Sequence, residues 1–272
     1  MPAHYYDAHT HLCDTRLDRV RETFLAQRQT LQINRVVVSG TSETDWPRVH
    51  QLATRFPDFV IPTYGLHPWF APHRHSDWKE KLHVYLASRN AGLGEIGIDK
   101  WKRDLSFPDQ MRVFQEQLEL LSEYPRPCII HCLKAWDDLY GAIKQNPALG
   151  HSGFLLHSYS GPRHLIPKFA ECGGWFSISG YFAQPRKLKQ REILSTLPIN
   201  RLLVETDSPD MLPPAPYLSH PIKESTSREP VNHPANLESI YQFVANLFGL
   251  SISDFSRQIT LNFKDFYGPL MA

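Results

Sequence analysis

The sequence of 272 residues predicts a (β/α)8 barrel of the TIM type with additional helices at its C-terminus. Short apolar runs alternate with amphipathic helical segments over most of the chain, and eight such runs can be counted. Eight exceeds the roughly five to seven strands of a doubly wound sheet. No shift in composition divides the chain, so we expect one domain over residues 1–272.

The first strand is expected to end within Tyr5-Tyr6-Asp7-Ala8-His9-Thr10-His11. Residues 17–31 carry apolar side chains at helical spacing, and residues 35–40 contain three successive valines, as in a strand covered on both faces. The same alternation then repeats. Further strands are expected at 59–65, 92–96, 128–131, 154–157, 175–178 and 202–205, and helices at 46–56, 78–89, 110–124, 135–145, 165–172 and 186–194.

The alternation ends after the eighth strand. Residues 208–232 include six prolines, which exclude regular structure over a stretch too long for an ordinary connection. This loop leaves the barrel on the face of the N-terminal histidines, so we expect either a rim that covers substrate or a loop draped over the surface. Two helices, 236–247 and 253–266, are expected to follow it.

Composition limits the classes of partner. The 29 basic and 28 acidic residues give a net charge of +1, so no overall field favours a polyanion or an anionic membrane, and any nucleic-acid contact must be local. No apolar run is long enough to span a bilayer, and the four cysteines form no C-x-x-C pair. We therefore expect a cytoplasmic protein without disulfides and without a membrane partner.

Polar side chains gather at the expected carboxyl ends of the strands, where the reactive groups of such barrels lie. His9 and His11 are two residues apart, so they project to one side of a strand and can chelate one ion. The other candidates are Glu95, His131, His157 and Asp207. Any one of them alone reads as a hydrogen-bonded core group. Together these six groups are too many ligands for one tetrahedral ion, but they suit two ions with Glu95 as the bridge.

The order and spacing of these motifs resemble those of TatD-type metal-dependent deoxyribonucleases of the amidohydrolase-like superfamily. The matching segments are Asp7-Ala8-His9-Thr10-His11, Gly65-Leu66-His67-Pro68, Gly94-Glu95-Ile96-Gly97-Ile98-Asp99, Ile130-His131-Cys132, His157-Ser158-Tyr159-Ser160-Gly161, Glu205-Thr206-Asp207-Ser208-Pro209 and Asn262-Phe263. The resemblance implies that His9, His11 and Asp207 hold one metal ion, that His131 and His157 hold the other, and that Glu95 is shared.

By this resemblance the chain is expected to remove nucleotides from a DNA end, preferably a single-stranded one, with two divalent ions (Mg, Mn or Zn) activating a water. Glu95 and Asp207 are the expected catalytic residues, with Asp207 also accepting a proton. His67 and Lys100 are expected to bind substrate oxygens. Glu205 is expected to brace a neighbour. Protein partners stay open.

The chain departs from the family pattern at Lys100, at Leu133 and at His233 of Asn232-His233-Pro234. These positions bear on substrate identity more than on metal binding. Two alternatives therefore stay open. One is a hydrolase of C–N or ester bonds, although such enzymes of the superfamily often carry a lysine where Glu95 stands. The other is a metal-binding or metal-free scaffold in a nucleic-acid or protein complex. Cys13 and Cys132 are expected in the core, and the basic run at 186–191 on a solvated helix face.

Overall fold

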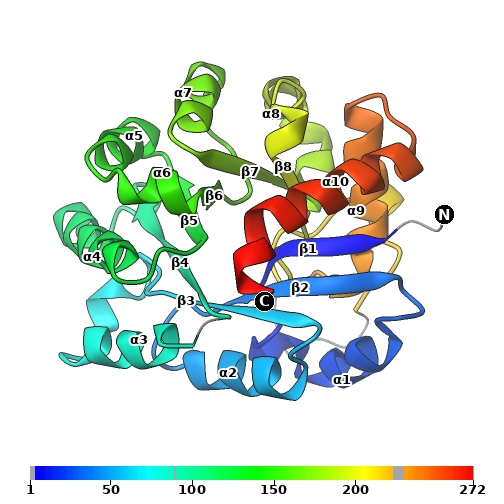
Figure 1. The fold of residues 1–272 in the computed structure, drawn as a ribbon. Coiled ribbons are helices and arrows are strands. Elements are labelled where there is room, and N and C mark those ends of the chain that lie inside the picture. Colours follow the sequence, from blue (N-terminus) through cyan, green and yellow to red (C-terminus); the bar gives the residue numbers. More distant parts are fainter. Residues whose placement is uncertain (1–3, 89, 223–229, 272) are drawn as a thin grey trace.

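Eight parallel strands form a nearly closed barrel surrounded by helices in the computed structural model, which describes residues 4–88, 90–222 and 230–271 (Figure 1). The strands neighbour one another in the order of the sequence. They are β1 (Tyr5–Thr10), β2 (Ile33–Ser39), β3 (Val60–Tyr64), β4 (Gly92–Asp99), β5 (Cys128–Leu133), β6 (Phe154–Leu156), β7 (Gly174–Ser179) and β8 (Leu202–Glu205). The predicted fold class is confirmed.

The helices lie on the outside of the strands because each buries one apolar side against them. In α2, for example, Trp46, Val49 and Leu52 follow helical spacing and are buried. The helices are α1 (Asp18–Gln27), α2 (Trp46–Arg55), α3 (Trp78–Leu86), α4 (Phe107–Glu119), α5 (Trp136–Lys144), α6 (Ala148–Ser152), α7 (Ile166–Glu171), α8 (Leu188–Leu194), α9 (Leu237–Leu247) and α10 (Ile252–Tyr267).

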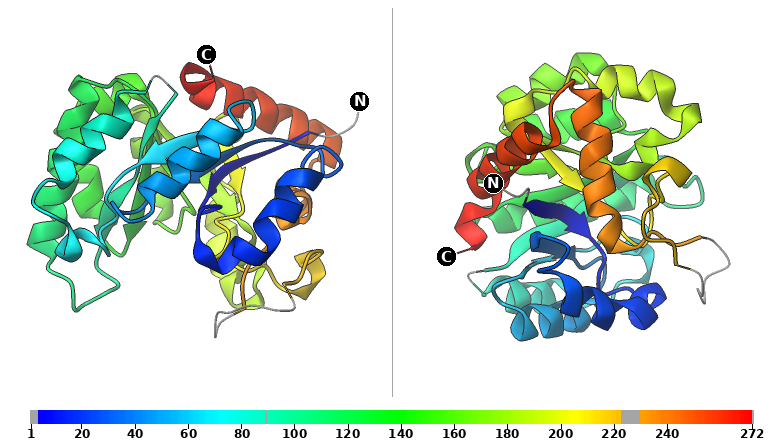
Figure 2. Two further views of the ribbon diagram at one scale, coloured as in Figure 1. Left: turned by 90° about the horizontal axis from the view of Figure 1, so that it is seen from below. Right: turned by 90° about the vertical axis from the view of Figure 1, so that its right-hand side faces the viewer.

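The last helix closes one end of the barrel. Phe263, Phe266 and Tyr267 of α10 pack against a second buried cluster inside the strands, and the Tyr267 hydroxyl donates to the carbonyl of Ala8 at 2.8 Å. In the left view of Figure 2, α10 lies at one end of the barrel and the segment after β8 at the other. The site is thereby left to the carboxyl ends of the strands.

Backbone hydrogen bonds join the end of β1 to the segment after β8. The amide of Asp207 donates to the carbonyl of His9 at 3.0 Å, and the amide of His11 donates to the carbonyl of Ser208 at 2.7 Å. Because these bonds alternate along the two segments, the side chains of β1 and of the β8 end are held side by side. The closure of the barrel is therefore also what brings the first histidines to Asp207.

The differences from the predicted elements lie mainly at their ends. The helix expected at 17–31 begins as a 3-10 turn at Thr15–Leu17 and ends at Gln27, and β4 and β5 run on to Asp99 and Leu133. Helix α6 was not predicted, because five residues are too few for a periodic pattern. The end of the helix expected at 78–89 falls on Arg89, which lies outside the described residues.

The proline-rich loop has little regular structure where it is described. Residues 208–222 and 230–232 contain a 3-10 turn at Ala215–Tyr217 and one bridge between Pro221 and Asn232, while the rest of the predicted loop lies outside the described residues. Among the helices that the structure describes, none is long and apolar enough to cross a membrane.

Candidate metal centre

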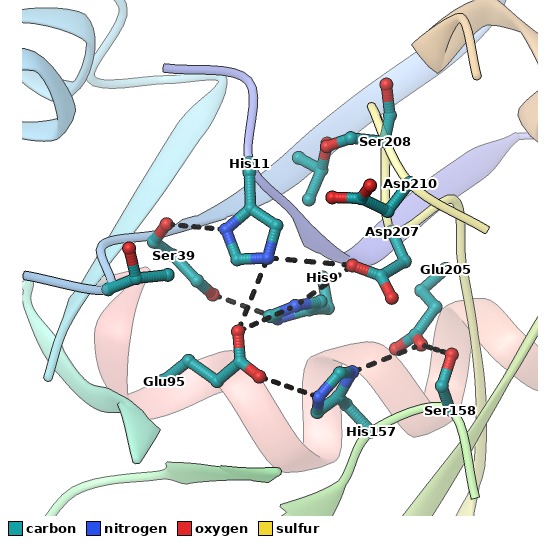
Figure 3. Close-up of polar contacts among 12 residues, drawn as sticks. His9, His11, Ser39, Glu95, His157, Ser158, Glu205, Asp207, Ser208 and Asp210 are labelled. Carbon is teal, nitrogen blue, oxygen red and sulfur yellow. Dashed lines mark hydrogen bonds and ion pairs between the residues drawn. The ribbon is translucent and has the colours of Figure 1, made fainter. Parts of the chain in front are cut away.

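All six predicted metal ligands meet at the carboxyl ends of the strands, with Glu95 at their centre. Figure 3 shows five of them: His9, His11, Glu95, His157 and Asp207. Its Oε2 is 3.5 Å from His9 Nε2 and 3.3 Å from His11 Nε2. Its Oε1 is 2.8 Å from His157 Nε2 and 3.2 Å from His131 Nδ1. Oε2 thus faces the two histidines of β1, and Oε1 faces His157 and His131, with His67 Nε2 also 3.3 Å from Oε1.

Close contact between β4 and β5 makes this arrangement possible. Gly97 pairs in register with His131 and has a φ of 151°, and a Cβ at Gly97 would collide with the carbonyl oxygen of His131. Glycine is therefore required for the two strands to approach so closely. The approach brings Glu95 within reach of the β5 histidine.

Asp207 closes the site on the β1 side. Its Oδ1 lies 3.5 Å from His9 Nε2 and 3.6 Å from His11 Nε2. The residue has a φ of 50°, in the left-handed region that is unfavourable for most side chains and is frequent at functional sites. Asp207, His9 and His11 therefore form one of the groups whose ligand atoms are close enough to hold an ion together.

Hydrogen bonds on the far nitrogens identify which ring nitrogen of two histidines is free to bind a metal. His11 Nδ1 lies 3.0 Å from the carbonyl oxygen of Ser39, and His131 Nε2 lies 3.1 Å from Oδ2 of Asp99. A carbonyl or ionised carboxylate oxygen only accepts, so each of these nitrogens carries the proton. In the neutral ring that binds a metal, the lone pair is then on His11 Nε2 and on His131 Nδ1, the atoms that face Glu95.

His67 has the opposite arrangement. Its Nδ1 accepts a hydrogen bond from the amide of Trp69 at 3.2 Å, so the proton of the neutral ring is on Nε2, which faces Oε1 of Glu95 at 3.3 Å. Burial lowers the pKa of His67 to about 4, although the charge of Glu95 acts to raise it. The His67 ring is therefore neutral. His67 is therefore set as a hydrogen-bond donor at the edge of the cluster.

Two buried ring nitrogens lack a hydrogen-bond partner among the described residues: Nε2 of His9 and Nδ1 of His157. A buried polar atom without a partner costs roughly 1–3 kcal/mol. His9 Nε2 faces the carboxylates of Glu95 and Asp207, and a cation bound between them would satisfy it. The residues present therefore fit a divalent ion.

The charge of the cluster supports the same conclusion. Burial would raise the pKa of Glu95, but the imidazoles packed around it, that of His157 first, hold it well below its usual value. Burial likewise opposes ionisation of Asp207, but the adjacent imidazole of His9, with those of His157 and His11, lowers its pKa to about 2. Two buried, ionised carboxylates surrounded by imidazoles are the donor set that Zn²⁺ or Mn²⁺ accepts.

A family comparison agrees with this geometry. The model of the TatD related DNases matches residues 6–268. The chain belongs to the TatD-related DNase family. It is a metal-dependent hydrolase of that family, with a TIM barrel and clusters of histidines and carboxylates able to bind metal.

Two relatives and two solved structures illustrate the similarity. The chain is 28% identical to a 3'-5' ssDNA/RNA exonuclease TatD of Erwinia billingiae, over 96% of this chain and 98% of that one. It is 30% identical to the uncharacterized metal-dependent hydrolase YjjV of Escherichia coli K12, over 78% and 82% of the two chains. The crystal structure of YjjV superposes with a TM-score of 0.84 and 25% identity, over 97% and 98% of the two chains. A TatD-family hydrolase of Entamoeba histolytica, 18% identical, shares the fold with a TM-score of 0.85 over 99% of both chains.

In this TatD-family chain the side chain of Glu205 is held by two serines beside His157. Its side chain accepts hydrogen bonds from Ser158 at 2.6 Å and from Ser177, and it faces His157 Nδ1 at 3.6 Å (Figure 3). A carboxylate that already accepts two hydroxyls holds its position. Glu205 therefore presents a fixed carboxylate to His157, and the bracing role expected of it stays a prediction.

Two supporting residues were not given a role from the sequence. Asp99 binds His131, and the hydroxyl of Ser39 lies 3.0 Å from His9 Nδ1. Asp99 ends the segment Gly94-Glu95-Ile96-Gly97-Ile98-Asp99, four residues after Glu95. Alternation along a strand places two residues four apart on the same face. Ser39 ends β2 among valines, and nothing in its sequence context marks it.

Lys100 is engaged away from the cluster. Its Nζ is 2.6 Å from Oδ2 of Asp138 on α5 and lies 4.2 Å from the ring centre of Phe107. Its predicted contact with substrate would require this ion pair to open. That role stays a prediction.

The remaining sequence-based expectations concern residues outside the cluster. Cys13 and Cys132 are buried in the main hydrophobic core, as predicted for small core residues. Burial raises the pKa of both thiols. Within the basic run, Arg186 donates to the hydroxyl of Tyr181, and Arg191 donates to the carbonyls of Phe182 and Gln184.

Proposed function

We propose that this hydrolase removes nucleotides from a free end of single-stranded DNA by hydrolysing phosphodiester bonds with two divalent ions. The observation that carries the proposal is the position of Glu95, because Oε2 faces the two expected ligands of one ion, His9 and His11, and Oε1 faces those of the other, His131 and His157. A carboxylate placed in this way suits a bridge between two ions, the arrangement of many phosphodiesterases.

His9, His11 and Asp207 would hold one ion, His131 and His157 the other, with Glu95 shared between them. Mg, Mn and Zn are the candidate metals. Such ions would lower the pKa of a water and offset the negative charge that develops on the phosphate.

The residues of the chain have separate tasks in this reaction. Asp207 accepts the proton of the attacking water, since its carboxylate is ionised and faces the cluster. The Nε2–H of His67 donates a hydrogen bond to a non-bridging phosphate oxygen, in keeping with its neutral tautomer. Glu205 and Asp99 hold His157 and His131 in orientation.

The choice of nucleic acid is supported by the relative from Erwinia billingiae, whose name describes an ssDNA/RNA exonuclease. A flexible single strand also enters the mouth of a barrel more readily than a stiff duplex. The alternative is hydrolysis of a C–N or ester bond. Superfamily members with that activity often have a bridging lysine on the fourth strand, and this chain has Glu95 at that position.

One experiment tests the proposal. Purified protein is incubated with end-labelled single-stranded DNA, double-stranded DNA and RNA, and with closed circular single-stranded DNA, under Mg²⁺, Mn²⁺ or Zn²⁺ and in EDTA. We expect stepwise shortening of the linear single strand, no reaction in EDTA and no early cutting of circles. Activity that survives thorough chelation contradicts the metal dependence, and rapid cutting of circles contradicts the requirement for an end.

A further inference from the structure

A half-exposed tryptophan stands beside the metal centre. Trp101 follows β4 by two residues, and 52% of its surface is exposed. One exposed apolar side chain alone needs no explanation. What distinguishes Trp101 is how its position is fixed, which rings it adjoins and what charge surrounds it.

The backbone of Trp101 is tied to the group that orients His131. Its amide donates to Oδ1 of Asp99 at 2.5 Å, while Oδ2 of the same carboxylate is hydrogen-bonded to His131. One side chain therefore fixes both the metal-facing imidazole and the start of the loop that carries the tryptophan. Trp101 is held at a set place relative to the site.

A row of rings leads from the site to Trp101. The ring of Trp69 lies 5.2 Å from that of His67 and 5.9 Å from that of His131, and its indole N–H donates to Asp99 at 2.6 Å. Trp101 is the next ring outward, 6.2 Å from Trp69 at an angle of 31°. Lys102 places its Nζ 3.9 Å from the centre of the Trp69 ring. Trp69 is thus engaged, and Trp101 is the member of the pair with a large exposed area.

The charge around the platform suits a polyanion. Lys100, Lys102 and Arg103 lie within the four residues after the end of β4, and one acidic residue, Asp104, follows them. Lys100 is paired with Asp138, whereas Lys102 forms no ion pair within the part of the chain that the structure describes. Its ammonium is available to a phosphate group.

We propose that Trp101 is a stacking platform for a nucleobase of the strand being cleaved, and that Lys102 contacts a phosphate beside it. The inference rests on the proposed nuclease function and deepens it. Aromatic side chains next to cations bind single-stranded nucleic acids in this way, and stacking tolerates any base because every base has a π face. A base can stack on Trp101 only when it is unpaired, so the platform selects single strands.

The test measures how much a base contributes to binding. Metal-free protein in EDTA is titrated against fluorescein-labelled hexathymidylate, and against versions in which one of the three residues at the 3' end is abasic, with anisotropy as the readout. For the wild type we expect at least one abasic position to weaken binding by roughly five- to a hundred-fold. Trp101→Ala should bind natural and abasic strands almost equally, and Trp101→Phe should recover most of the difference.

Leu261→Ala is the matched control, because Leu261 is 59% exposed on α10, at the opposite end of the barrel. It should keep the wild-type ratio. The proposal is overturned if Trp101→Ala keeps that ratio, if the wild type shows no base dependence, or if the wild type does not bind the strand. Hydrolysis of the same strand with Mn²⁺ is measured separately: base-dependent binding without hydrolysis would refute the proposed function and leave the platform in place.

Discussion

Nε2 of His131 lies 3.1 Å from Oδ2 of Asp99, and this hydrogen bond determines which nitrogen of His131 faces the metal centre. Because the carboxylate can only accept, the ring proton is on Nε2 and the lone pair is on Nδ1, 3.2 Å from Glu95. Asp99 is buried and is not itself among the six ligands. Its role is to position one of them.

Asp99→Asn should lower metal affinity or turnover by about ten- to a hundred-fold, because the amide no longer stabilises the N–H of His131 with a full charge. Bound metal after gel filtration and kcat on a labelled strand measure the effect. Glu22→Gln is the control, since it removes an exposed ion pair with Arg55. An Asp99→Asn protein with unchanged metal content and unchanged kcat would contradict the role of Asp99.

His67→Ala should keep its metal while losing affinity for substrate. Its Nδ1 is used by the amide of Trp69, so it has no free lone pair for an ion. The missing donor to a phosphate oxygen should cost roughly ten-fold or more in kcat/KM. His67→Gln, which retains an N–H donor, should recover part of the loss. The exposed His73 supplies the control in His73→Ala. Loss of bound metal from His67→Ala would identify His67 as a ligand instead.

Asp207→Asn removes the expected proton acceptor and one ligand of the first ion while preserving size. Loss of a general base typically costs about a hundred- to ten-thousand-fold in rate, and weaker metal binding adds to it. Turnover, metal content and thermal unfolding should be measured together, with the fold expected to survive.

Glu205→Gln, measured in the same assay, distinguishes a residue that supports His157 from one that takes part in the reaction. Glu205 contacts Ser158, Ser177 and His157, so its loss should act through His157 and cost less, about ten-fold. If Asp207→Asn turns over at a near-normal rate with its metal bound, the assignment of Asp207 is wrong.

Phe263→Ala should destabilise the barrel. The side chain is fully buried where α10 closes the interior, and emptying such a site costs about 3–5 kcal/mol. Leu261→Ala on the same helix removes an exposed side chain and should change the free energy of unfolding by about 0.5 kcal/mol or less. Denaturant unfolding measures both. Equal effects would mean that α10 does not stabilise the barrel through its buried face.

The order of the elements and the approximate site could be predicted because both are local properties of the chain. Buried parallel strands appear as short apolar runs, as in β2 and β8, and a polar residue that ends such a run must lie at the barrel mouth. His9, His11, His131, His157 and Asp207 all follow this rule. Ends of elements were less certain: β4 runs on to Asp99 because its pairing with β5 continues through Gly97.

What only the tertiary structure decided is the state of each functional side chain. The sequence by itself determined that six possible ligands share one face of the barrel and that His67 lies near them. Which ring nitrogen of His11, His67 or His131 carries the proton depends on partners 28, 2 and 32 residues away in the chain. The ion pair of Lys100 likewise depends on Asp138 of α5, and the position of the Trp101 ring depends on Trp69 in the segment after β3. Sequence patterns record burial and periodicity, whereas hydrogen bonding and charge pairing are set by distances between segments that only folding brings together.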